Sequence, residues 1–141
     1  PRFSLIFCTI LKKFIPVIVP PPPTILPVLS KVKTVYISWF DVYKKLEKTH
    51  KYTLGQKIDN LFIEIIESIS LATFLDKTEK QPWIKFAIRK LDTIKILLLV
   101  LWETRSIDDK PYIALSEPIH EIGKMLGGWN GQVTKSLEQT K

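Results

Sequence analysis

Apolar residues recur at three- and four-residue steps along most of the chain, which is the spacing of one face of an α-helix. Stretches of this kind predict four helices, at about residues 34–49, 54–76, 78–102 and from 109 to a stop at 127–128. No segment alternates with period two for long enough to predict a strand. Because the connections are short, successive helices should be antiparallel neighbours. The pattern therefore predicts an all-α fold, an antiparallel up-down-up-down four-helix bundle.

Residues with capping ability stand at the ends of these stretches. A threonine side chain can accept a hydrogen bond from the free N–H groups of a first helical turn, so Thr34 and Thr53 are predicted N-caps. Thr78 and Gln81 have the spacing of a capping box, with a proline next in the first turn. Gly127-Gly128 predicts the end of the fourth helix, because glycine accepts the left-handed conformation common there.

Composition divides the chain near residue 33. Residues 1–33 hold seven of the ten prolines and five basic residues with no acid, so we expect an extended or disordered Pro-rich leader. Residues 34–130 would form the bundle and 131–141 a polar tail. Lys12-Lys13 interrupts the apolar runs of the leader well before the ~20 residues of a membrane span. We expect a cytoplasmic protein without a membrane partner, although a membrane-surface anchor or a proline-rich docking segment stays open for the leader.

The third helix has more apolar surface than a single bundle can cover. Residues 96–102 are apolar on every side, whereas a four-helix bundle shelters only about half of each helix. Exposed patches of this size favour a subunit interface. The predicted interface residues are Trp83, Phe86, Ile96, Leu97, Leu99, Val100 and Trp102. The alternative is a central helix in a compact monomer.

Candidate catalytic chemistry is sparse. Glu117 and His120 have the Glu-x-x-His spacing of di-iron bundles, and so do Glu47 and His50, but the second pair lies among lysines at a helix end. The single cysteine, Cys8, has no neighbouring histidine to activate it. We therefore expect no enzymatic activity, metal, cofactor or small-molecule substrate. A metal-dependent enzyme is the weakest of the hypotheses kept.

Basic clusters are the stronger functional signal. The chain has 21 Lys and Arg against 14 Asp and Glu, a formal net charge of +7. Lys44 and Lys48 are four residues apart and face the same side of a helix, as do Lys85 and Arg89. The candidate nucleic-acid-binding residues are Lys44, Lys45, Lys48, Lys51, Lys57, Lys85, Arg89, Lys90, Lys95, Arg105 and Lys124. A merely solvated face is the alternative for any one helix.

Two stretches resemble the signatures of one family. Residues 52–58 (YTLGQKI) and 121–129 (EIGKMLGGW) are similar to those of the accessory variability determinants of diversity-generating retroelements. These proteins are related to four-helix-bundle proteins encoded in intervening sequences of ribosomal RNA genes. The resemblance covers about residues 34–130. It implies a barrel-like homopentamer without an active site that binds the element's reverse transcriptase and its RNA, supporting mutagenic retrohoming.

The chain departs from that family in two respects. Its third helix has no cation between residues 96 and 102, and its leader matches nothing in the family. The main hypothesis is an accessory subunit that binds RNA or DNA and a reverse transcriptase. The alternative is a protein-interaction bundle of the intervening-sequence type that binds no nucleic acid.

Glycines and charges within the two stretches also have structural explanations. Gly55 and Gly123 fall inside predicted helices, where glycine costs about 1 kcal/mol relative to alanine, so they predict close approach of another helix. Glu121 and Lys124 are spaced to pair across one turn. Trp129, after the glycine pair, is expected to pack over the end of the bundle.

Overall fold

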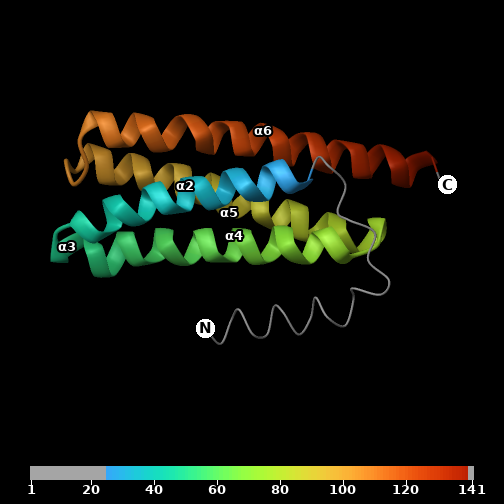
Figure 1. The fold of residues 1–141 in the computed structure, drawn as a ribbon, viewed down its shortest axis with the longest axis horizontal. Coiled ribbons are helices and arrows are strands. Elements are labelled where there is room, and N and C mark those ends of the chain that lie inside the picture. The colour runs from blue at the N-terminus through green and yellow to red at the C-terminus, as the bar shows by residue number, and fades with distance from the viewer. Residues whose placement is uncertain (1–24, 140–141) are drawn as a thin grey trace.

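The computed structural model describes residues 25–139, and within them the fold is all-α, as predicted. Its four long helices are α2 (Ile25–Lys45), α4 (Gln56–Phe74), α5 (Lys77–Glu103) and α6 (Asp109–Gln139). A short helix α3 (Lys48–His50) and a π-helical turn η1 (Lys51–Gly55) connect α2 to α4. The long helices lie side by side as a bundle (Figure 1).

Each long helix has two main neighbours. α4 packs against α2 and α5, and α6 packs against α5 and α2, so α2 and α5 are diagonal partners. The α2–α4 and α5–α6 connections lie at one end of the bundle, at the left of Figure 1, and the α4–α5 connection lies at the other.

The predicted apolar faces form the core. On α4 the buried positions include Ile58, Leu61, Ile65 and Ile69, at the predicted spacing. The α6 face from Leu115 to Trp129 is buried as expected. Fully buried side chains of this size each contribute roughly 1.5–3 kcal/mol relative to exposure, so these faces drive the packing of the helices.

The first helix begins earlier than predicted. α2 starts at Ile25, and Thr34 lies inside it, where its hydroxyl donates to the Ser30 carbonyl oxygen at 3.0 Å instead of capping the helix. Val28 and Val32 extend the apolar face backwards and are buried, which favours helix over an extended leader. The boundary at residue 33 was therefore wrong for residues 25–33. The prediction for residues 1–24 lies outside the described residues.

The fourth helix ends later than predicted. α6 passes through Gly127 and Gly128 and continues to Gln139, so residues 131–139 are helical. Val133 is buried beyond the glycines, and Gln81 of α5 donates to the Thr134 hydroxyl at 2.6 Å. These tertiary contacts offset a glycine cost of about 1 kcal/mol per residue.

The predicted threonine caps are also absent. Thr53 lies within η1, and its hydroxyl donates to the Thr49 carbonyl oxygen at 3.2 Å. α5 begins at Lys77 after Asp76, with no side-chain hydrogen bond to the cap, so Thr78 and Gln81 form no capping box. Gln81 is instead engaged with α6, and the proline after it lies in the second turn rather than the first.

Candidate nucleic-acid interface

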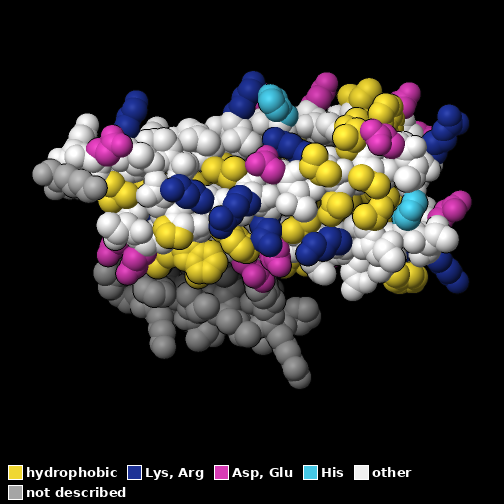
Figure 2. All heavy atoms as spheres, turned by 180° about the vertical axis from the view of Figure 1, so that it is seen from behind, with side chains coloured by type: hydrophobic (Ala, Val, Ile, Leu, Met, Phe, Trp, Pro, Cys, Tyr) yellow, Lys and Arg dark blue, Asp and Glu magenta, His cyan; other side chains and the backbone are white. Residues whose placement is uncertain are grey.

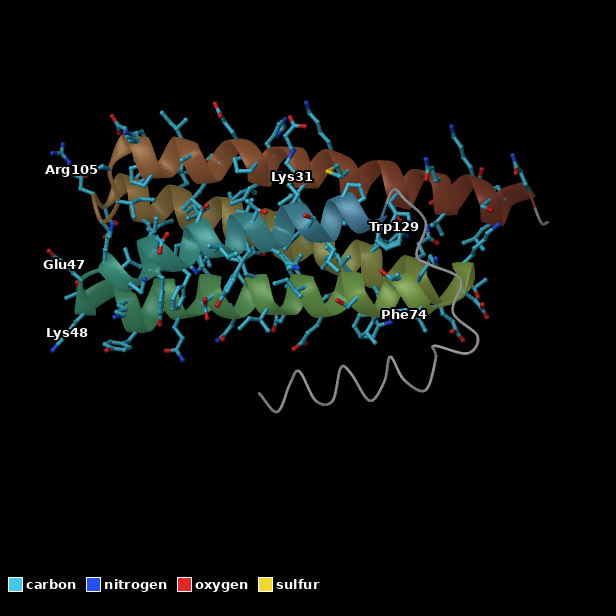
Figure 3. All side chains as sticks on the ribbon, in the orientation of Figure 1. Lys31, Glu47, Lys48, Phe74, Arg105 and Trp129 are labelled. Atoms are coloured by element: carbon cyan, nitrogen blue, oxygen red, sulfur yellow. The ribbon has the colours of Figure 1, made fainter. Side chains whose placement is uncertain are left out.

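Basic residues gather at the end of the bundle where α2 passes into α4. Residues 44–57 contain five lysines and one glutamate, a net charge of +4. They fold as the last turn of α2, then α3, η1 and the first turn of α4. Figure 3 places Lys48 at this end, together with Arg105 from the α5–α6 connection. We call the basic end the set Lys44, Lys45, Lys48, Lys51, Lys57 and Arg105.

Close packing at Gly55 gives this end its shape. A Cβ atom on Gly55 would lie 3.1 Å from Tyr43 Cε2 and 3.2 Å from the His50 carbonyl oxygen, so only glycine lets η1 approach α2 this closely. The predicted close approach at Gly55 is confirmed. Nδ1 of His50 is hydrogen-bonded to the Ser106 hydroxyl, which ties this segment to the α5–α6 connection.

Part of the positive charge at the basic end is already paired. Lys44 lies 3.5 Å from an Asp41 carboxylate oxygen. Lys45, Lys48 and Lys57 are exposed and form no ion pair with any residue between 25 and 139. These three lysines are therefore available to an external anion.

Aromatic rings are interleaved with the lysines, and the sequence did not single them out. Lys51 Nζ lies 5.7 Å from the centre of the Tyr43 ring and 6.0 Å from that of Tyr52, and Lys44 Nζ lies 5.2 Å from that of Phe40. Phe40, which lies in α2, is exposed. The composition of the segment could have indicated an exposed ring near cations, because Tyr52 has lysines close to it in the sequence and lies outside the apolar face of α4.

A second basic surface covers the first two thirds of α5. Residues 77–95 hold six basic and two acidic residues, a net charge of +4. Figure 2 shows Lys and Arg side chains across the middle of the view from behind, among hydrophobic ones. Lys85 and Arg89 are exposed without an ion pair inside the described range, and we call these two the basic face.

The other predicted binding residues on α5 and α6 are engaged within the chain. Lys90 pairs with Glu64 of α4 at 3.5 Å and lies 4.8 Å from the centre of the Phe86 ring. Lys95 pairs with Asp92 at 3.6 Å. Lys124 pairs with Glu121 at 3.7 Å, as the spacing predicted. The structure thus places most of the predicted residues at the basic end or on α5, while Lys124 lies on α6.

The predicted interface residues of α5 retain exposed apolar surface. Ile96 is 60% exposed, and Trp83 and Trp102 are 38% and 37% exposed. Phe86, Leu97, Leu99 and Val100 are half-buried. The Trp102 side chain is partly engaged within the chain, because its indole N–H donates to Asp109 Oδ1 at 2.6 Å and its ring stacks on Tyr112.

Residues 121–129, the second stretch with a family resemblance, have a packing role on α6. Gly123 lies near α5, where a Cβ atom would be 3.3 Å from Lys95 Nζ and 3.6 Å from Leu91 Cδ2. Trp129 is buried, with Lys80 Nζ 5.8 Å from the centre of its ring. This stretch therefore joins α5 and α6, and its two charged residues, Glu121 and Lys124, pair with each other.

Tyr36 and Asp59 form a polar contact between α2 and α4. Burial first, and then the hydrogen bond and charge of Asp59, raise the pKa of Tyr36 to about 12. The tyrosine therefore stays neutral well above its ordinary range.

Two further features bear on function. Between residues 25 and 139, no group of three or more His, Cys, Asp and Glu side chains is placed to hold a metal ion. No described helix combines the length and the apolar character needed to cross a membrane.

Comparisons with protein-family models, with curated proteins and with solved structures found no match to this chain. The assignment of function therefore rests on the surfaces described above and on the resemblance of the two short stretches.

Proposed function

We propose that this chain is a non-enzymatic, nucleic-acid-binding accessory subunit of a diversity-generating retroelement. In this proposal it is an antiparallel up-down-up-down bundle that assembles with its copies as a barrel-like homo-oligomer, a pentamer by resemblance. It would bind RNA or DNA together with the reverse transcriptase of the same element, in the cytoplasm, and support mutagenic reverse transcription.

The observation that carries the proposal is the basic end. Its residues 44–57 concentrate a net charge of +4 at one end of the bundle, and Lys45, Lys48 and Lys57 have no ion-pair partner among the described residues. Lysines held close together repel one another unless anions or solvent screen them. A phosphate backbone does so and releases its condensed counterions on binding, which drives association.

Assembly would strengthen this binding. Ile96 is 60% exposed on α5, and other apolar side chains of α5 are only half-buried. Burying them between copies would bring several basic ends into one particle, so that their fields add and their phosphate contacts multiply.

The test is binding of a fluorescent 20-nucleotide RNA, measured by anisotropy over a range of salt concentrations. K45E/K48E should weaken binding strongly and flatten its salt dependence, because each lost phosphate contact lowers the slope by about one. The matched control is K33E/K135E, which changes the net charge equally at two other exposed lysines. Equal losses for both variants, or no binding by the wild type, would refute the proposal.

The second candidate function, a protein-interaction bundle without nucleic-acid binding, is favoured by one observation. α2 and α4 expose large apolar side chains, including Ile37 (63%) and Leu71 (46%). Such a module would show no RNA retention at moderate salt. Co-purification with a reverse transcriptase after nuclease treatment would separate direct protein binding from tethering through RNA.

A further inference from the structure

Tyr52 is the most exposed aromatic side chain of the described residues, with 61% of its surface accessible. It lies in η1, the π-helical turn between α3 and α4. π-helical turns are rare and occur frequently at functional sites. A ring exposed to this extent contributes little to the core, so packing does not explain its presence.

The surroundings of Tyr52 combine rings with ammonium groups. Lys51 Nζ lies 6.0 Å from the centre of the Tyr52 ring, and the neighbouring Lys48 is exposed and without an ion pair. Phe40, which is 44% exposed, lies beside Lys44 in the same way at the end of α2. Rings and cations therefore alternate over the basic end.

This alternation suits single-stranded nucleic acid. An unpaired base offers its flat face to an aromatic ring while the adjacent phosphates contact lysines. In a duplex the base faces are covered by neighbouring bases, so the ring would add nothing to the phosphate contacts. An acidic protein would satisfy the charge but supplies no comparable series of flat rings.

We propose that Tyr52 is a stacking platform for an unpaired base, and that the basic end binds single-stranded nucleic acid in preference to duplex. This inference rests on the proposed function and narrows its ligand class. Lys45 and Lys48 supply phosphate contacts, and Tyr52 supplies the preference for single strands.

The test compares three probes on the full-length protein. They are a mixed-sequence 20-nucleotide RNA, the same RNA annealed to its complement, and heparin, a polyanion without bases. Y52L should weaken binding of the single strand by about tenfold and leave duplex and heparin binding unchanged. Y52F, which keeps the ring, should bind like the wild type. F74L is the matched control, because Phe74 is an exposed ring at the other end of the bundle (Figure 3).

Each other outcome counts against the inference. If Y52L binds all three probes like the wild type while K45E/K48E binds them weakly, the role of Tyr52 as a stacking platform is refuted and the proposed function stands. If Y52L weakens all three probes equally, Tyr52 has only a structural role. If F74L loses as much single-strand affinity as Y52L, the effect is not specific to the Tyr52 ring. If the wild type binds heparin but neither RNA, the nucleic-acid function and the inference fall together.

Discussion

Gly55 and Leu46 are in contact so close that no side chain fits between them. A Cβ atom on Gly55 would lie 2.9 Å from Leu46 Cδ1. Leu46, the residue directly after α2, is buried, so it cannot turn into solvent without losing its own packing. The contact joins η1 to the segment that follows α2 and thereby fixes the part of the chain that carries the basic end.

Gly55→Ala should therefore destabilise the fold. Overpacking of this kind costs about 1–3 kcal/mol, which exceeds the gain in helix propensity from alanine. Urea unfolding followed by circular dichroism measures the difference. Gly127→Ala is the matched control, because nothing lies within 4 Å of a Cβ atom there, and it should be neutral or stabilising by up to about 1 kcal/mol. Equal stabilities for the two variants would contradict the packing role of Gly55.

Arg105 should be replaceable by glycine with a gain in stability. Its φ is 62°, in the left-handed region that costs a non-glycine residue roughly 1–2 kcal/mol. The N–H of Ser106 donates to the Leu101 carbonyl oxygen at 2.8 Å, and that of Arg105 to Trp102 at 3.0 Å, a Schellman ending in which glycine is usual. Arg105→Gly should raise the melting temperature. Arg105→Lys should leave the melting temperature unchanged, because lysine is as unfavourable as arginine in the left-handed conformation. Similar increases in melting temperature for both variants would show that the backbone conformation is not the cause.

The Tyr36–Asp59 contact predicts a loss of stability at high pH. The pKa of Tyr36 is about 12 in the folded chain, against an ordinary value of 10.0. Because the folded pKa is the higher one, the contribution is fully present below pH 10 and is lost as the pH rises through 12.

Tyr36→Phe provides the measurement for this contact. The difference in phenolate absorbance between wild type and Tyr36→Phe should appear near pH 12. Asp59→Asn should lower the pKa of Tyr36 only in part, since burial is the largest cause of the shift. A wild-type difference titration centred near pH 10 would show that the contact does not form.

The exposed apolar part of α5 predicts an effect on assembly. Ile96→Asp should reduce the mass measured by light scattering towards that of a single chain, because it places a charge within the proposed subunit interface. Ile37→Asp is the matched control, since Ile37 on α2 is similarly exposed, at 63% against 60% for Ile96. Its mass should match that of the wild type. A wild-type protein that is monomeric at all concentrations would refute the proposed interface.

Much of the helical fold could be predicted, because core positions repeat regularly. Ile58, Ile65 and Ile69 of α4 lie at intervals that only a helix brings to one face, and all three are buried. The ends of the helices were less predictable. Thr34 and Gly127 carry local end signals, yet both lie inside helices because packing beyond them outweighs a local preference of about 1 kcal/mol.

The candidate site divides in the same way. The net charge of the basic end could be predicted from the sequence, since residues 44–57 contain five lysines and one glutamate in any conformation. The sequence also determined the helical class through its periodicity. Only the tertiary structure decided which cations are available to an external anion. Lys90 of α5 forms an ion pair with Glu64 of α4, whereas Lys48 forms none with any acid among the described residues. Likewise the exposure of Tyr52 depends on how η1 turns against α2, and that turn is set by packing between segments rather than by neighbours in sequence.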